Sequence, residues 1–209
     1  MLSVVTLGLS ALYFAPATAS SFSYEGLQLS YSQTSADDQF AVDGFDVNSI
    51  RIEGLYSLNP NIAVGASYIS GSGDTRVQLT NGNFATDVDV SGPAAFGFYH
   101  DEIKPGTDYL VGGFFSMEES EFSAGGQEMT QLSDDDSSAA LLGGIRHLLS
   151  PQLEVGTLAT YELNADDDEF SFEINARYSF GNNFDLLASF TPDSDADTIA
   201  IGIKKYLDF

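Results

Sequence analysis

The chain has 209 residues, of which 31 are acidic and 7 basic, and its formal net charge is -24. This excess of acid excludes a nucleic-acid-binding protein, because phosphate contacts require clustered Lys and Arg. The absence of Cys excludes disulfides, thiolate metal sites and Cys nucleophiles, while 16 Phe, 10 Tyr and 20 Gly favour strands over helices.

Residues 1–19 have the features of a secretory signal peptide. An apolar stretch runs from Leu2 to Phe14, and the motif ATA at 17–19 is a small-x-small cleavage pattern. The stretch is shorter than the ~20 residues that a membrane-spanning helix needs. We therefore expect export, removal of the leader and a single mature domain at 20–209.

After the leader, apolar and polar residues alternate with a period of two, which indicates strands. In the segment FSFEINARYSF at 170–180, every second residue is apolar and the residues between them are polar or charged. Most of the alternating segments are 9–14 residues long, which is enough for strands that cross a membrane, because these need about 9–11 residues. Ten segments are predicted as strands: 22–33, 47–58, 61–71, 86–100, 106–118, 137–149, 152–164, 168–180, 183–191 and 197–208.

The connectors between these segments alternate in length. Short turns are expected at 59–60, 101–106, 150–151 and 181–183, and longer acidic connectors at 34–46, 72–85, 119–136, 165–167 and 192–196. Outer-membrane barrels have short periplasmic turns and longer outer loops. The sequence thus predicts an all-β, closed antiparallel transmembrane β-barrel of ten strands, with both termini in the periplasm. Gly92 and Pro93 interrupt one segment, so eight strands are the alternative.

Charged residues of both signs occupy the polar face of the predicted strands. In a membrane barrel this face lines the interior and the apolar face meets lipid. The predicted lumen-facing charges are Arg51, Glu53, Arg146, Glu154, Glu162, Glu173, Arg177, Asp185 and Lys204.

Aromatic residues gather near the ends of the predicted strands. Membrane barrels carry aromatic girdles at both interfaces. The residues expected in these girdles are Tyr56, Tyr68, Phe96, Phe98, Tyr161, Tyr178, Phe180, Phe184 and Phe209.

The chain ends on an alternating strand with the residues YLDF, and it contains the segments YEG at 24–26, IAVGASY at 62–68 and IGIKKY at 201–206. In these features it resembles the small outer-membrane β-barrel proteins of Gram-negative bacteria, of the opacity or porin-like type. The resemblance implies that Tyr206 and Phe209 belong to a signal for the barrel-assembly machinery during insertion. It also implies contact with outer-membrane lipid and lipopolysaccharide.

Carboxylates cluster in the predicted outer loops. Oxygen ligands of this kind suit Ca²⁺ or Mg²⁺, although no run has the spacing of an EF-hand. The alternative is a solvated acidic surface. The candidate ligands are Asp134, Asp135, Asp136, Asp166, Asp167 and Asp168. Apart from such a loop-bound ion, we expect no cofactor.

A catalytic role is not expected. The two histidines, His100 and His147, fall near predicted periplasmic turns, and the Gly-x-Ser-x-Gly motif is absent. Because the interior of a narrow barrel is filled by side chains, the lumen charges are interpreted as a plug. The sequence predicts a structural or surface-interaction protein. One alternative is a narrow cation-preferring porin, and another is a soluble exported β-sandwich adhesin or lectin.

Overall fold

The computed structural model describes residues 24–36, 45–79, 82–124, 127–128, 134–163, 170–181, 183–192 and 196–207. The predicted signal peptide at 1–19 lies outside the described residues. The strands are β1 (Gly26–Ala36), β2 (Phe45–Asn59), β3 (Ile62–Leu79), β4 (Gly82–Lys104), β5 (Thr107–Ala124), β6 (Gln127–Glu128), β7 (Asp134–Leu148), β8 (Leu153–Glu162), β9 (Phe170–Gly181), β10 (Phe184–Thr191) and β11 (Ala196–Lys205).

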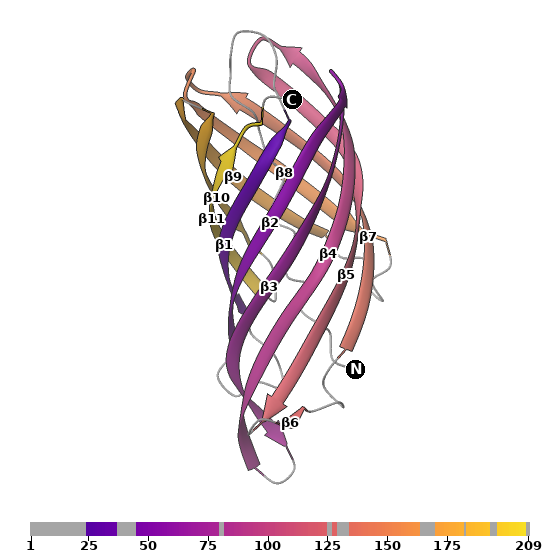
Figure 1. Cartoon of the computed structure of the whole chain (residues 1–209), viewed down its shortest axis with the longest axis vertical. Helices are drawn as coiled ribbons and strands as arrows, with labels where there is room; N and C mark the ends of the chain where they lie inside the picture. The colour runs from indigo at the N-terminus through magenta and orange to yellow at the C-terminus, as the bar shows by residue number, and fades with distance from the viewer. Residues whose placement is uncertain are drawn as a thin grey trace.

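The ten long strands form a closed antiparallel barrel (Figure 1). Each long strand pairs with the next one along the chain, and β1 pairs with β11 to complete the ring. The two-residue strand β6 only adds to β5. The predicted ten-strand barrel is therefore confirmed. The eight-strand alternative and the β-sandwich alternative are wrong, because a sandwich would leave sheet edges that this ring does not have.

Strand β4 continues through Gly92 and Pro93, where the sequence suggested a break. On the β3 side Pro93 pairs with Tyr68, whereas the β4–β5 ladder skips the two positions. The same register resumes at Ala94. Because proline lacks only its own N–H donor, one gap in a ladder does not end the strand.

The connector expected at 72–85 is mostly strand. β3 continues to Leu79 and β4 begins at Gly82, with Asp74 directly opposite Asp87. Both aspartates are exposed. Because polar residues such as Ser72 and Asp74 occupy outward positions in this stretch, the apolar outward face that marks the other strands is missing here.

The two faces of the barrel are inverted relative to a soluble protein. On β11, Ile203 points outward and is 52% exposed, whereas the adjacent Lys204 points inward and is 0% exposed. The same contrast holds on β2, where Ile52 is 59% exposed and Glu53 is 2% exposed. An apolar exterior with a polar interior is the arrangement of a transmembrane barrel. No helix in the described part of the chain is long and apolar enough to span a membrane.

The two ends of the barrel differ. At one end, called here the short-turn end, tight turns join β2 to β3, β4 to β5 and β9 to β10, and β1 starts where β11 stops. At the other, the loop end, β3, β4 and β5 extend farthest (bottom of Figure 1). Outward-facing exposed carboxylates near the loop end are Asp46, Asp74, Asp87, Asp89, Glu119, Glu121, Asp135 and Asp197.

Candidate functional site in the barrel lumen

Eight of the nine charges that the sequence placed on the inward face are buried, each at most 6% exposed: Arg51, Glu53, Arg146, Glu154, Glu173, Arg177, Asp185 and Lys204. The ninth, Glu162, is half-buried and accepts a hydrogen bond from the Ser138 hydroxyl at 2.9 Å. Four of the seven Lys and Arg residues of the chain are thus inside the barrel. The buried charged residues of the lumen, acidic and basic, divide into two groups with different contacts.

The first group begins at Asp108 on β5, which the sequence did not single out. Its Oδ2 accepts hydrogen bonds from Arg146 Nε at 3.1 Å, from Arg146 Nη2 and from the Tyr24 hydroxyl at 2.9 Å. His100 Nδ1 lies 3.4 Å from the same oxygen. A buried carboxylate is stabilised by such a set of donors.

The group continues around the wall from β7 to β10. Glu154 Oε1 is 4.0 Å from Arg146 Nη1, and Glu154 Oε2 accepts a hydrogen bond from Arg177 Nη2 at 2.7 Å. Arg177 Nε in turn lies 3.1 Å from Asp185 Oδ2, which also accepts a hydrogen bond from the Tyr206 hydroxyl. The ammonium of Lys204 lies 5.1 Å from the centre of the Tyr206 ring.

We call Asp108, Arg146, Glu154, Arg177, Asp185 and Lys204 the turn-half network. Its members lie near the short-turn end, on strands that follow one another around the ring. Three carboxylates are balanced by three cations. Paired charges such as those of Arg146 and Arg177 can stay in a low-dielectric interior, whereas Lys204 Nζ has no described hydrogen-bond partner.

Tyr24 is the second residue that sequence reasoning missed. It precedes β1 yet is 0% exposed, and its ring lies 3.9 Å from that of His100 and 4.9 Å from that of Phe98, measured between centroids. The Arg146 guanidinium lies 4.3 Å from the ring centre. The alternation of β1 carried the signal, since Tyr24 has the parity of the inward-facing Gln28.

Gly26 allows the chain to turn from this inserted tyrosine into β1. Its φ is +154°, and a Cβ at this position would lie 2.6 Å from the backbone oxygen of Lys205. A side chain here would therefore force the backbones of β1 and β11 apart.

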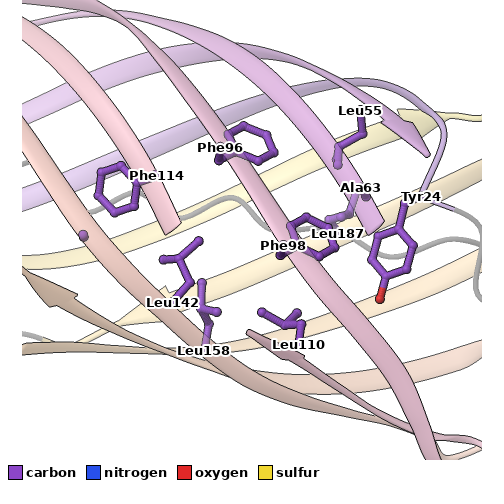
Figure 2. Close-up of a cluster of buried hydrophobic side chains, with 11 residues drawn as sticks. Tyr24, Leu55, Ala63, Phe96, Phe98, Leu110, Phe114, Leu142, Leu158 and Leu187 are labelled. Carbon is purple, nitrogen blue, oxygen red and sulfur yellow. The ribbon is translucent and has the colours of Figure 1, made fainter. Parts of the chain in front are cut away.

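An apolar cluster fills the lumen beside the network (Figure 2). Its members are Tyr24, Leu55, Ala63, Phe96, Phe98, Leu110, Phe114, Ala140, Leu142, Leu158 and Leu187. Leu187 comes from β10, which lies five strands around the ring from β4, the strand of Phe96 and Phe98. The cluster therefore reaches between opposite walls of the barrel.

Phe96 and Phe98 correct the expected aromatic girdle. They are 6% and 3% exposed and point into the lumen, because the inward positions of β4 are its even-numbered residues in this stretch. The outward positions of this stretch are the small residues Ala95 and Gly97 followed by Tyr99, so here the larger apolar residues mark the lumen side and not the lipid side. Phe209 lies outside the described residues, and the other six expected girdle residues are exposed on the outer surface: Tyr56, Tyr68, Tyr161, Tyr178, Phe180 and Phe184.

The second group of charges lies nearer the loop end. We call Arg51, Glu53, Glu118 and Glu173 the loop-half cluster. Neither carboxylate oxygen of Glu53 has a hydrogen-bond partner among the described residues, and the same holds for Glu118 Oε1, Glu173 Oε2 and Arg51 Nη1. Glu173 Oε1 accepts a hydrogen bond from Asn175 Nδ2 at 2.8 Å. Buried polar groups without partners are costly. Single atoms of the turn-half network, such as Asp108 Oδ1 and Lys204 Nζ, also lack a described hydrogen-bond partner, but each carboxylate of that network accepts at least one hydrogen bond, whereas Glu53 accepts none from the described residues.

Gln28 separates the two groups on one side of the lumen. It is directly opposite Lys204 on β11 and directly opposite Glu53 on β2. Two such steps separate the Cβ atoms of Lys204 and Glu53 by about 10 Å, and the two long side chains extend across Gln28 far enough for the ammonium to act on the carboxylate electrostatically.

The candidate metal ligands at 134–136 begin β7 instead of lying in a loop. Asp135 and Asp136 are successive strand residues, so their side chains point to opposite faces and do not converge. Asp166, Asp167 and Asp168 lie outside the described residues. Within the part of the chain that the structure describes, no group of three His, Asp or Glu is arranged to hold a metal ion.

His100 and His147 lie apart. His100 faces the lumen at Asp108, whereas His147 is exposed on β7 and its Nδ1 shares a hydrogen bond of 2.8 Å with the Thr107 hydroxyl. The two histidines therefore belong to separate structural contacts.

No family model matches the chain, and no curated protein sequence matches it. Among solved structures, the translocator domain of the autotransporter NalP from Neisseria meningitidis matches with a TM-score of 0.56 at 11% identity, over 88% of this chain and 89% of that one. The β-domain of the Bordetella autotransporter Brka matches with a TM-score of 0.51 at 12% identity, over 88% of this chain and 100% of that one. At these identities the likeness shows the fold alone, and the fold is that of outer-membrane β-barrel proteins.

Proposed function

We propose that the protein is an integral outer-membrane protein with a closed lumen and a non-catalytic, structural or surface-interaction role. The main support is the filled cross-section near the short-turn end. There the turn-half network lines the walls from β5 to β11, and the apolar cluster, with members from β4 and β10, reaches between opposite walls. A solute path would have to displace both.

The proposed topology places the short-turn end in the periplasm, together with both chain termini, and the loop end outside the cell. The leader at 1–19 is removed, Tyr206 and Phe209 serve recognition by the barrel-assembly machinery, and lipid and lipopolysaccharide surround the apolar band. Lys205 supports the location of the short-turn end at a membrane interface. It is exposed, and its ammonium lies 5.7 Å from the ring centre of Phe184. Long cationic side chains of this kind can extend toward headgroups.

The acidic loop end is the proposed interaction surface. Directly opposed carboxylates there include Asp46 with Asp74, Asp89 with Glu121, and Glu119 with Asp135. Like charges opposite one another destabilise a sheet, so this surface favours cations or cationic partners that offset the repulsion.

Conductance in planar lipid bilayers tests the closed lumen. Protein whose folding and insertion are verified by gel mobility and by co-flotation with vesicles is expected to give no discrete conductance steps. As a positive control, the double variant Phe98→Ala/Leu187→Ala removes side chains from opposite walls and is expected to conduct. Discrete, cation-selective steps from the unaltered protein would contradict the closed lumen and support the narrow porin instead.

A further inference from the structure

The outward apolar face of the barrel continues into the short turns. Each of the four turns that join described strands at the short-turn end carries one large apolar side chain: Leu58, Ile103, Leu149 or Phe180. Leu149 begins the turn between β7 and β8, and each of the other three is the last residue but one of its strand, on β2, β4 and β9.

These four side chains are as exposed as those in the middle of the lipid-facing surface. They are 59%, 59%, 58% and 64% exposed, in chain order, whereas Ile52 is 59% and Ile201 is 56% exposed. All four occupy outward positions, because side chains alternate between the two faces of a strand. One exposed apolar side chain is ordinary on a surface in water, but the same feature at four turns out of four indicates shared apolar surroundings.

The backbone of these turns finds hydrogen-bond partners within the chain. A carbonyl in each turn accepts a hydrogen bond from the backbone N–H of a neighbouring strand or, at the last turn, of the residue that follows β11. The pairs are His100 N to Asn61 O at 2.8 Å, Leu148 N to Gly106 O at 2.9 Å, Ser179 N to Gln152 O at 2.8 Å and Tyr206 N to Asn183 O at 3.0 Å.

Three of the turns also cap their own backbone N–H groups with side chains. Asn59 Oδ1 accepts a hydrogen bond from Asn61 N at 2.9 Å, Glu102 Oε1 from Gly106 N at 2.8 Å, and Ser150 Oγ from Leu153 N at 3.0 Å. Water would satisfy these groups on a solvated turn, whereas a turn in a membrane must satisfy them internally. This observation is independent of the apolar side chains and supports the same surroundings.

Charged side chains at the same end limit how deep the turns can lie. Asp101, Lys104 and Lys205 are exposed there. Such groups stay among the headgroups, and long cationic side chains extend toward them. The turns therefore fit the boundary between headgroups and acyl chains, not the centre of the hydrocarbon region.

We infer that the short turns are covered by the phospholipid leaflet on the periplasmic side, with Leu58, Ile103, Leu149 and Phe180 inserted at the boundary between headgroups and acyl chains. The occupant is lipid because these residues continue the lipid-facing surface of their own strands without a break in alternation. The inference rests on the proposed function, since the barrel must span the membrane, and it adds that the short-turn end lies within the leaflet and not in water.

Single-tryptophan fluorescence tests the inference, because the chain has no Trp of its own. Leu58→Trp, Ile103→Trp, Leu149→Trp and Phe180→Trp are each inserted into vesicles of dioleoylphosphatidylcholine, with or without bromine in the upper part of the acyl chains. Ile52→Trp is the control for the lipid-facing surface, and Asp87→Trp, at an exposed outward position near the loop end, is the control for water. Gel mobility before and after boiling confirms that each variant is folded, and the remaining turn variants carry the test if one does not fold.

We expect bromine to reduce the emission of the turn variants and of Ile52→Trp at least twofold, and to leave Asp87→Trp unchanged. Acrylamide in the water should quench Asp87→Trp at least threefold more strongly than the turn variants. Turn variants that behave like Asp87→Trp while Ile52→Trp is quenched by bromine would overturn the inference and leave the proposed function standing; a partner other than lipid would then cover the turns. Absence of bromine quenching in Ile52→Trp as well would overturn the membrane location itself.

Discussion

The turn-half network and the loop-half cluster each contain three carboxylates, but these carboxylates differ in their hydrogen-bond and ion-pair partners. In the turn-half network, Glu154 is in contact with two arginines, and Asp108 accepts several hydrogen bonds. In the loop-half cluster, Glu53 is just as buried, but neither of its oxygens has a described partner. The comparison teaches that burial of a charge does not reveal its role. Paired charges hold the wall together, whereas replacing the Glu53 carboxylate breaks no hydrogen bond with a described residue.

The largest effect is expected from removing a cation of the network. Arg146→Met leaves Asp108 and Glu154 buried without their shared partner, which we expect to cost about 3–5 kcal/mol in the free energy of unfolding. Urea unfolding of protein folded into lipid vesicles measures this. The matched variant Arg51→Met breaks no ion pair with a described residue and is expected to cost less than about 1.5 kcal/mol. Equal losses in the two variants would remove the distinction between the halves.

A smaller effect is expected at the tyrosine that crosses the lumen. Tyr24→Phe removes only the hydroxyl, which donates to Asp108 and accepts from Arg146 Nη2, so a loss of about 1–3 kcal/mol is expected. Tyr68→Phe, at a position 52% exposed on the outer surface, is the control and should change stability by less than about 0.5 kcal/mol. If both variants unfold at the same urea concentration, Tyr24 does not fasten the chain to the opposite wall.

The smallest effect is expected from a neutral contact near the loop end. The Thr34 and Thr198 hydroxyls share a buried hydrogen bond of 2.9 Å across β1 and β11. Thr34→Val is expected to cost about 0.5–1.5 kcal/mol, and adding Thr198→Val should recover part of the loss because no hydroxyl is left unpaired. Further loss in the double variant would show that the hydroxyls act separately.

The alternation of apolar and polar residues predicts the barrel, because every lipid-facing position of a membrane strand favours an apolar side chain. The same rule predicts the inward face of Arg51, Arg146 and Arg177. The alternation fails to predict a strand where the outward positions do not carry apolar side chains. The strand residues around Asp74 have polar side chains such as Ser72 at outward positions, so they were predicted to be a loop.

Alternation also fails to say which side chains meet across the lumen. Tyr24 and Asp108 are 84 residues apart in the chain, and their contact depends on the closure of the ring. The alternation places Tyr24 and Asp108 on the inward face, but it does not show that their side chains are in contact. For the same reason, the division of the charges into a paired and an unpaired group required the three-dimensional arrangement.

The most direct test of this division is the unfolding free energy of two variants with identical chemistry, Glu154→Gln and Glu53→Gln. Both glutamates are 2% exposed, so the variants differ only in the contacts that are removed. We predict that Glu154→Gln loses about 3 kcal/mol or more, since it leaves a buried arginine short of a partner, while Glu53→Gln is unchanged or gains up to about 1 kcal/mol. A loss at Glu53→Gln equal to that at Glu154→Gln would contradict the account, because Glu53 would then be a structural charge like those of the turn-half network.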